Sequence, residues 1–242
     1  MELIEKAIAK AKRENGTRKD EPGTARPAHE SAQVPAGPGS GPGWTRQLTD
    51  IFYSRTRTVE RAPEHWESNR LVGGDKNSSV ADLFRMLRTK VLLPMRENGW
   101  RTLGVVGPTA GVGKSTIAAN LAMSIAMDGN QTVLLVDLDL RKPRVAHYFG
   151  VNPEHGLADY LEGRVQVEDI LVNPGIERLV LLPATGTRPN SSELVGSARM
   201  GALFDEIRDR YESRVVIYDM PPLLASSDSL SFLPRFDAVL LV

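Results

Sequence analysis

The feature that most constrains this chain is a glycine-rich segment at residues 107–115, which lies between an apolar run at 103–106 and an alanine-rich stretch at 116–122. This order predicts a strand, a phosphate-binding loop and a helix. Glycines let consecutive backbone N–H groups approach phosphate oxygens, the helix N-terminus adds its dipole, and Lys114 follows to contact the β- and γ-phosphates. We therefore expect a nucleoside triphosphate to bind through a continuous set of loop residues: Gly111, Val112, Gly113, Lys114, Ser115 and Thr116.

The loop departs from the usual spacing in one place. The pattern G-x-x-x-x-G-K-[ST] requires a glycine at position 108, where this chain has Pro108, and the nearest glycine is Gly107. The alternative is a glycine-rich turn with only a structural role. A Gly-Lys-Ser sequence between an apolar strand and an alanine-rich helix favours nucleotide binding over that alternative.

Acidic residues follow two further apolar runs. Residues 133–136 precede Asp137 and Asp139, and residues 215–218 precede Asp219. Continuous apolar runs predict parallel strands that are buried on both faces, and open α/β sheets bind ligands at the carboxyl ends of such strands.

Magnesium bound to ATP takes oxygen ligands and keeps several waters. The set that suits it comprises Ser115, Asp137, Asp139 and Asp219. For each aspartate alone, a role as a helix cap or a turn residue is the better explanation. Three of them at strand ends beside a phosphate loop favour a magnesium site.

Together, the variant loop, the D-x-D-x-R pattern at 137–141 and the D-x-P-P pattern at 219–222 resemble the bacterial tyrosine kinases. The resemblance covers about residues 75–242 and extends to the segments 141–144, 156–163 and 189–194. Arg141 is the discriminating residue, because the related partitioning and division-site ATPases share the loop and usually lack this arginine. Those ATPases also commonly carry a further lysine early in the loop, where this chain has Thr109.

The resemblance implies transfer of the γ-phosphoryl group of ATP to a tyrosine hydroxyl, with catalysis by positioning and charge neutralisation. It assigns Lys114 to the β- and γ-phosphates. Magnesium would be bound by Ser115 and, through water, by Asp139 and Asp219. Asp137 would orient or deprotonate the incoming tyrosine. Arg141 would stabilise phosphate or order the loop, with an ion pair to a nearby carboxylate as the alternative.

Two other functions stay open. A partitioning-type or division-site-type ATPase switch would use the same loop to hydrolyse ATP slowly, with water as the nucleophile. A structural partner would bind nucleotide only to stabilise an assembly. Formation of phosphotyrosine separates a kinase from both.

A predicted helix at about 80–94 carries Asp82, Arg85 and Arg88 at three-residue steps. They resemble the family motif E-x-x-R-x-x-R, with Asp in place of Glu, which implies that the domains assemble into homo-oligomeric rings. The alternative is an ordinary amphipathic helix with an intrahelical ion pair, worth a few tenths of a kcal/mol.

Composition narrows the remaining possibilities. The chain has 242 residues, 41% of them hydrophobic, which suffices for one substantial α/β core. Its 30 basic and 30 acidic residues make no electrostatic case for nucleic-acid binding. It has no cysteine, its four histidines lack metal-ligand spacing, and no apolar run approaches the roughly 20 residues needed to cross a bilayer. We therefore expect a cytoplasmic protein.

The chain divides into four predicted segments. Residues 1–15 form a short amphipathic helix, for which we favour partner docking and whose apolar face comprises Leu3, Ile4, Ala7, Ile8 and Ala11. Residues 16–48 form a flexible Pro/Gly-rich linker. Residues 49–79 form a connecting arm, with short apolar pieces at 51–53 and 58–59 that could add an edge strand, and an extended piece at 69–72. Residues 80–242 form the kinase domain.

The predicted fold is an α/β P-loop NTPase with a mostly parallel sheet flanked by helices. Strands are expected at 103–106, 132–136, 179–182, 215–218 and 238–242, and helices at 80–94, at 114–127, around 144 and 157, and at 192–211. The run at 238–242 resembles a central strand. Complete family members continue beyond such a strand to a tyrosine-rich tail, so we expect a C-terminally truncated domain. Its five tyrosines are scattered.

The resemblance also implies a role in exopolysaccharide or capsule synthesis and export. The short helical start is similar to that of the exosortase-associated branch of the family. A membrane-spanning chain-length regulator would be the activator. The chain would then be peripheral to the inner membrane through that partner.

Overall fold

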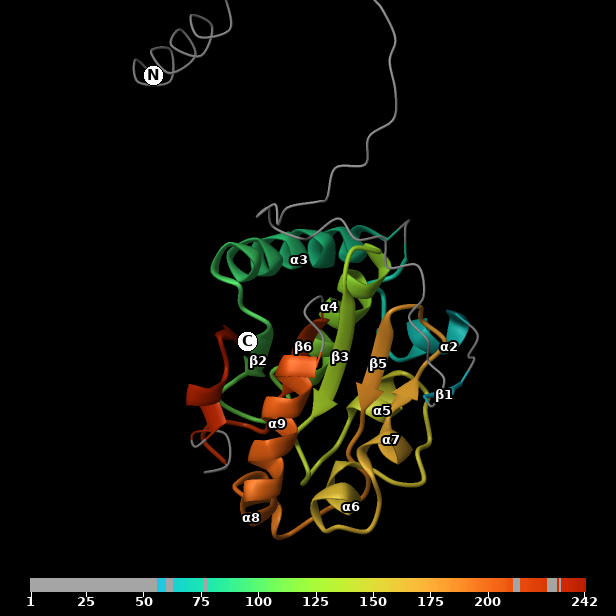
Figure 1. The fold of residues 1–242 in the computed structure, drawn as a ribbon. Coiled ribbons are helices and arrows are strands. Elements are labelled where there is room, and N and C mark those ends of the chain that lie inside the picture. Colours follow the sequence, from blue (N-terminus) through green and yellow to red (C-terminus); the bar gives the residue numbers. More distant parts are fainter. Residues whose placement is uncertain (1–55, 60–62, 76–77, 211–213, 226–229, 231) are drawn as a thin grey trace, which may run out of the picture. The chain divides into compact units, whose positions relative to one another are not determined.

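The computed structural model describes residues 56–59, 63–75, 78–210, 214–225, 230 and 232–242. The expected helix at 1–15 and linker at 16–48 lie outside the described residues, as does the part of the arm at 51–53. In the described part of the chain, seven strands form one sheet in the order β1-β4-β5-β3-β6-β2-β7. Every neighbouring pair is parallel except β4 and β5. The mostly parallel α/β fold is therefore confirmed (Figure 1).

Of the seven strands, five lie close to their expected positions, and the one at 172–173 was not expected. Their bounds are β1 Arg57–Thr58, β2 Thr102–Val106, β3 Thr132–Asp137, β4 Val172–Asn173, β5 Leu179–Leu182, β6 Arg214–Asp219 and β7 Ala238–Leu241. The helices are α2 Pro63–Ser68, α3 Ser79–Asn98, α4 Lys114–Met127, α5 Val145–Tyr148, α6 Leu157–Leu161, α7 Val167–Ile170, α8 Ser191–Val195 and α9 Ala198–Arg210, with a short 3₁₀ helix at Leu233–Arg235.

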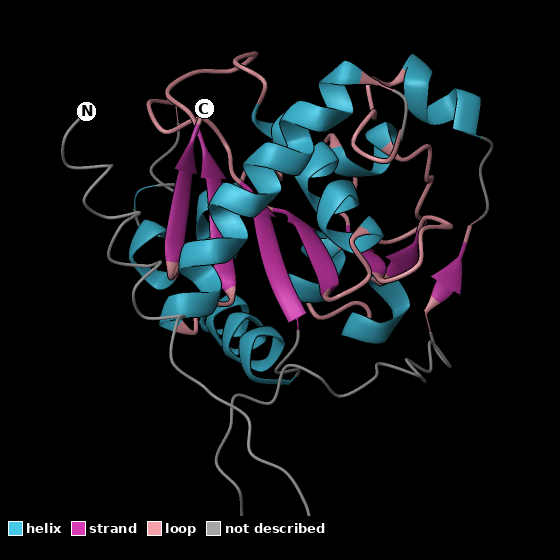
Figure 2. Cartoon of the chain, turned by 90° about the horizontal axis from the view of Figure 1, so that it is seen from above, coloured by secondary structure: helices cyan, strands magenta, loops and turns pink. Residues whose placement is uncertain are grey.

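Successive side chains of the central strands point to opposite faces of the sheet, which divides the core into two clusters. In β3, Leu134 and Val136 join one hydrophobic cluster, while Val133 and Leu135 join the other. Helices α6 to α9 cover the first cluster, and α3, α4 and α5 contribute to the second. Figure 2 shows helices on both sides of the strands. The continuous apolar runs in the sequence follow from this arrangement, since both faces of each strand are buried.

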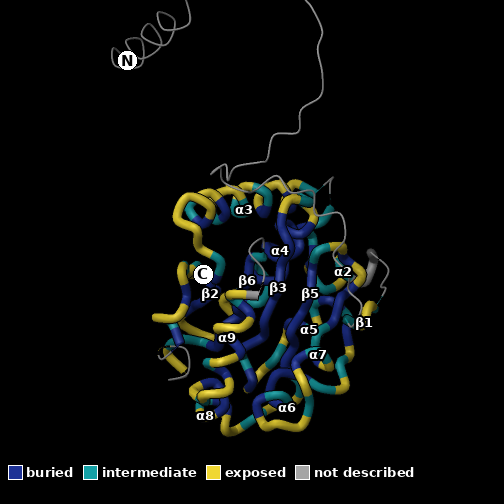
Figure 3. Tube along the Cα trace, in the orientation of Figure 1, coloured by how far each residue is buried: buried dark blue, intermediate teal, exposed yellow. Residues whose placement is uncertain are grey.

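Helix α4 lies against the sheet, and α3 packs on α4 (Figures 1 and 3). Most of the side chains of α4 from Ala118 to Ala126 are fully buried, because one side contacts strands and another contacts α3. The many alanines of α4 allow this close approach on two sides. In the described part of the chain, no helix combines the length and apolarity that a membrane crossing requires.

One expectation was wrong. The helix expected at 192–211 is two helices, because Gly196 ends α8 and the Ser197 hydroxyl accepts the N–H of Met200 (3.1 Å) at the start of α9. In the described sheet β7 forms an edge, and Val239 and Leu241 are exposed. The expectation that this run is a central strand of a longer domain stays a prediction. The arm contributes the opposite edge strand, β1, as one reading of residues 58–59 allowed, and it also contains α2, which sequence patterns missed.

Candidate nucleotide-binding and catalytic site

The glycine-rich loop joins the end of β2 to the start of α4. Gly111 and Gly113 have φ values of 81° and 103°, which residues other than glycine rarely adopt. The Nζ of Lys114 donates a hydrogen bond to the carbonyl oxygen of Thr109 (2.9 Å), and the side chain is nearly buried. The ammonium group is therefore held inside the curve of the loop.

A cavity of about 520 Å³ opens at this loop. Of the predicted site residues, the cavity brings together Gly111, Gly113, Lys114, Ser115, Thr116, Asp139 and Arg141. Val112, Asp137 and Asp219 do not line it. The two remaining aspartates nevertheless lie next to the cavity residues, because Asp137 and Asp219 are paired in register where β3 and β6 end.

Asp219 is fully buried, and neither of its carboxylate oxygens has a hydrogen-bond partner among the described residues. Burial raises the pKa of Asp219 to about 7. The nearby Ser115 hydroxyl and Lys114 ammonium offset part of that rise, whereas Asp139 adds to it. A buried carboxylate without partners beside a hydroxyl and an ammonium is suited to water molecules bound to a cation.

Asp137 is also fully buried, but its oxygens are occupied by backbone donors. Oδ1 accepts the N–H of Asp139 (3.2 Å), and Oδ2 accepts the N–H groups of Arg144 and Val145 (both 3.0 Å). Burial, and next the nearby Asp219, raise the pKa of Asp137 well above its ordinary value. The side chain thus anchors the segment between β3 and α5.

Arg141 donates to two hydroxyls of the segment at 189–194. Its Nε contacts the Oγ of Ser191 (2.8 Å), and its Nη2 contacts the Oγ of Ser192 (3.2 Å). The described part of the chain contains no ion pair of Arg141, so the alternative of a nearby carboxylate partner does not hold there. Two segments that carried the family resemblance therefore contact each other directly.

Four further residues with charged or hydroxyl-bearing side chains line the cavity without having been predicted: Arg70, Lys142, Arg144 and Tyr148. The hydroxyls of Tyr148 and Thr116 lie 2.7 Å apart and share a hydrogen bond. Proximity to the D-x-D-x-R pattern could have indicated Lys142 and Arg144. No local signal marks Arg70, since it comes from the arm that precedes α3.

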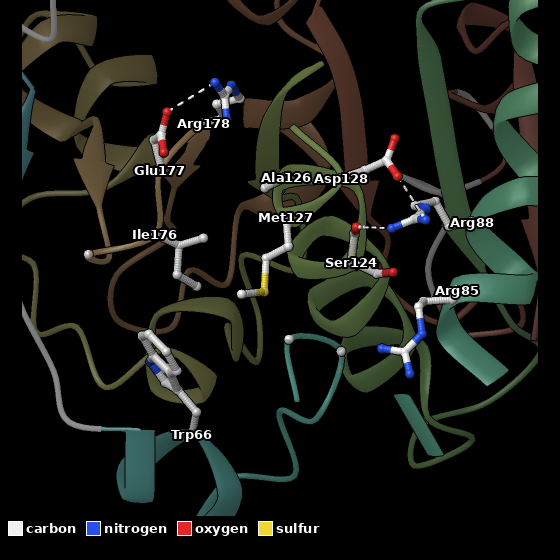
Figure 4. Close-up of a pocket in the computed structure, with 13 residues that line it drawn as sticks. Trp66, Arg85, Arg88, Ser124, Ala126, Met127, Asp128, Ile176, Glu177 and Arg178 are labelled. Carbon is white, nitrogen blue, oxygen red and sulfur yellow. Dashed lines mark hydrogen bonds and ion pairs between the residues drawn. The ribbon is translucent and has the colours of Figure 1, made fainter. Parts of the chain in front are cut away.

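The three residues expected to form ring contacts do not share one environment. Asp82 and Arg85 form an intrahelical ion pair at the surface of α3. Arg88 instead turns toward α4, where its guanidinium donates to the carbonyl oxygen of Ser124 and pairs with Asp128 (both 2.8 Å), as Figure 4 shows. Asp82 and Arg85 remain accessible to another molecule, whereas Arg88 is bound within its own chain.

Comparisons with known proteins agree with this geometry. The model of an AAA domain matches residues 101–240. EpsB of Ralstonia solanacearum, which carries the name of a tyrosine-protein kinase, is 40% identical over 165 residues. That match covers 66% of this chain and 21% of EpsB, so the chain spans about a fifth of the length of this relative.

Solved structures give the same result. The kinase domain of the Escherichia coli tyrosine kinase ETK matches with a TM-score of 0.66 and 29% identity, over 77% of this chain and 75% of that domain. The cell division ATPase MinD of Pyrococcus furiosus matches with a TM-score of 0.51 and 26% identity, over 59% of this chain and 58% of MinD. The division-site ATPase is thus the weaker match. The chain belongs to the AAA domain family and, within it, to the bacterial tyrosine kinases.

Proposed function

We propose that this chain is the catalytic domain of an ATP-dependent protein-tyrosine autokinase that regulates exopolysaccharide or capsule biosynthesis and export. The observation that carries the proposal is the cavity in which Lys114, Ser115 and Asp139 meet, next to the unpartnered Asp219. Similarity to relatives that carry kinase names supports tyrosine, rather than water, as the acceptor of the phosphoryl group.

ATP binds at the loop in this proposal. Gly111 and Gly113 bring backbone N–H groups toward the phosphates. In the structure, the ammonium of Lys114 donates to the carbonyl oxygen of Thr109 within the loop. When ATP binds, this ammonium would donate to the β- and γ-phosphate oxygens instead. Thr116, at the first turn of α4, contacts the phosphate chain on the other side of Ser115.

Magnesium fits the residues that are present. Ser115 would bind it directly, and Asp139 and Asp219 would hold its waters. The described residues include no group of three or more His, Cys, Asp or Glu side chains that could form a complete metal site, so phosphate oxygens and water would complete the coordination. When bound, the ion supplies neutralisation of the charge on the phosphates.

The predicted role of Asp137, to orient or deprotonate the incoming tyrosine, stays a prediction. In the structure its oxygens accept three backbone N–H groups, so the geometry supports a positioning role: Asp137 holds the segment from which Asp139 faces the cavity. For Arg141, the contacts with Ser191 and Ser192 support the ordering of the loop, rather than phosphate binding, as its part in the reaction.

The described tyrosines do not form an acceptor cluster. Tyr218 is fully buried, while Tyr148 and Tyr160 are half-buried on separate helices. The acceptor in the proposal therefore lies on another segment or another molecule. This requirement agrees with assembly into a ring through Asp82, Arg85 and Arg88, which we retain as part of the proposal.

The same proposal includes an activator. A membrane-spanning chain-length regulator would bind the kinase and place it at the inner membrane as a peripheral cytoplasmic protein. The proposal also keeps the similarity of the first residues to the exosortase-associated branch. It keeps the division of the chain into a helix at 1–15, a linker at 16–48, an arm at 49–79 and a kinase domain at 80–242.

The test is incubation of the full chain with ATP, Mg²⁺ and the cytoplasmic segment of its candidate membrane partner, followed by mass spectrometry for phosphotyrosine. Lys114→Met should lower phosphotyrosine formation roughly a hundredfold or more, because the developing phosphate charge loses its main cation. Asp137→Asn should lower it as well. Lys90→Met removes an exposed ammonium from α3 and should leave it unchanged.

The outcomes separate the candidate functions. Phosphotyrosine that persists in Lys114→Met would contradict the site assignment. ADP production without phosphotyrosine would favour the ATPase switch. Nucleotide binding with neither product would favour the structural partner.

A further inference from the structure

The arm before α3 is fastened to α4 by one buried amide. The Nδ2 of Asn120 donates to the carbonyl oxygens of Arg70 and Thr116 (both 2.9 Å). Its Oδ1 accepts the N–H groups of Val72 (2.7 Å) and Gly73 (2.8 Å). These four bonds use the full hydrogen-bonding capacity of the amide. The arm therefore has a defined position relative to the first turn of α4.

This close contact requires glycine in the arm. A Cβ atom at Gly73 would lie 2.4 Å from the backbone oxygen of Asn120, so a side chain at this position would displace the arm. Asn120 itself is fully buried. The arm and the nucleotide-binding helix thus form one unit on this side of the molecule.

Arg70 lies where α2 ends, at the edge of the nucleotide cavity: its N–H donates to the carbonyl oxygen of Glu67 (2.9 Å), and the N–H of Leu71 donates to that of Trp66 (2.8 Å). Arg70 has a φ of 63°, in the left-handed region that residues other than glycine rarely occupy. A left-handed residue with these two backbone bonds is a common way for a helix to end. The end of α2 and the Asn120 amide together therefore fix the backbone at Arg70. The side chain is exposed and lines the same cavity as Lys114 and Thr116.

The guanidinium of Arg70 is not used elsewhere in the described part of the chain, where it forms no ion pair. The guanidinium of Arg141, in contrast, is already bound to two serine hydroxyls. A guanidinium pairs with phosphate oxygens through two parallel N–H groups. A fixed backbone therefore presents an uncommitted, phosphate-binding group to the nucleotide cavity.

We propose that Arg70 is a nucleotide-binding residue, whose guanidinium contacts the phosphate chain on the Thr116 side of the cavity, and that Asn120 is its positioning residue. The inference rests on the proposed nucleotide site. It adds a cation that comes from outside the glycine-rich loop and the acidic motifs.

Titration calorimetry with ADP and Mg²⁺ tests the contact without turnover. Arg70→Ala should weaken ADP binding roughly tenfold, because a charge-assisted bond to phosphate is lost. The matched control is Arg178→Ala: Arg178 has a φ of 65° but lines a second cavity, which is separate from the nucleotide site (Figure 4). This control should bind ADP like the wild type, and adenosine affinity should not change in Arg70→Ala.

Lys114→Ala separates a failure of the proposed Arg70 contact from a failure of the proposed nucleotide site. Unchanged ADP affinity in Arg70→Ala, together with lost affinity in Lys114→Ala, would overturn the role of Arg70 and leave the nucleotide site intact. Unchanged affinity in Lys114→Ala would overturn the nucleotide site and the proposed function with it. Equal weakening of ADP and adenosine in Arg70→Ala would place the contact at the base and overturn the phosphate assignment.

A double-mutant comparison tests Asn120. Asn120→Leu should weaken ADP binding in the wild-type background and have little further effect in Arg70→Ala, because both changes remove the same contact. Additive effects would show that Asn120 affects ADP binding independently of Arg70, and no effect of Asn120→Leu on ADP affinity would show that it acts only on stability; either result would overturn its positioning role. Since Arg70 is exposed, the test of Arg70 holds even if Asn120→Leu fails to fold.

Discussion

At the scale of single residues, one carboxylate connects several segments next to the site. Asp159 accepts hydrogen bonds from Gly156 N–H (2.8 Å), the Thr185 hydroxyl (3.0 Å) and the Arg164 guanidinium (2.6 Å). Arg188 also pairs with it (3.3 Å) and donates its backbone N–H to the Leu140 carbonyl oxygen (2.9 Å). Asp159 therefore connects α6 to the D-x-D-x-R segment through Arg188, which contacts both.

Asp159 should stabilise the fold in a pH-dependent way. Burial acts to raise its pKa, but hydrogen bonds from Arg164, Gly156 and Thr185 prevail and lower it to about 2. An unfolded aspartate titrates near pH 3.9, so the stabilisation is complete above that pH and is lost as pH falls toward 2. The shift corresponds to about 2 kcal/mol.

Urea unfolding of Asp159→Asn checks this expectation. The variant should be less stable than the wild type by a constant amount between about pH 5 and 7, and the difference should shrink below about pH 4. Glu97→Gln alters an exposed carboxylate on α3 and should show no such difference. If the difference in the free energy of unfolding between the wild type and Asp159→Asn stays the same below about pH 4, the ionised Asp159 carboxylate is not its source.

At the scale of elements, aromatic packing fixes β2 against the segment before β7. Phe236 belongs to a cluster with Phe204, Tyr218 and Phe232, whose ring centroids lie 5.0 to 6.0 Å apart. Gly104 in β2 leaves room for that ring: a Cβ atom there would lie 2.5 Å from the Phe236 Cδ2. The glycine in an otherwise apolar strand is thus explained by packing.

Gly104→Ala should lower the free energy of unfolding by about 1–3 kcal/mol, because the added methyl group overpacks the ring. Phe236→Leu should remove much of that penalty, so that the two changes are not additive in denaturant unfolding. Gly201→Ala in α9 is the control, since its Cβ would meet only the flexible Arg235 guanidinium at 3.4 Å. Equal stability of Gly104→Ala and the wild type would refute the packing argument.

At the scale of the whole molecule, the outer surface of α3 offers a contact for other copies. Besides Asp82 and Arg85, the helix exposes four large apolar side chains along its length: Val80, Leu83, Met86 and Leu93. Arg88 lies on the inner side, with Ser124 and Asp128. The three residues of the predicted ring motif should therefore differ in what they stabilise.

Arg85→Ala should reduce assembly in sedimentation velocity and leave the unfolding of the monomer nearly unchanged. Arg88→Ala should reduce assembly and, in addition, lower the free energy of unfolding of the monomer by about 1–2 kcal/mol, because Asp128 and the Ser124 carbonyl oxygen lose their partner. Lys90→Ala, on the same helix, should affect neither property. A wild-type protein that stays monomeric at every concentration would rule out the ring for this chain.

Local patterns predicted the backbone of the site. The runs at 132–136 and 179–182 mark strands almost to the residue, because burial on both faces demands continuous apolar sequence. Parallel strands place their carboxyl ends at one edge, so Asp137 and Asp219 could be predicted to meet there. The break at Gly196 and Ser197 was equally local, a stop and a cap that were not recognised in the sequence.

Contacts between distant segments could not be predicted in this way. The sequence indicates that Asp137 and Asp219 each follow a buried strand. Only the packed structure leaves the first occupied by backbone N–H groups and the second without a partner. Likewise, helical spacing places Arg88 near Arg85, yet the position of α4 turns it inward. Arg70 lies at the nucleotide cavity because α2 ends there and Asn120 binds the arm to α4. Hydrogen-bond partners and burial depend on how elements pack together, whereas strand, loop and helix follow from near neighbours in the chain.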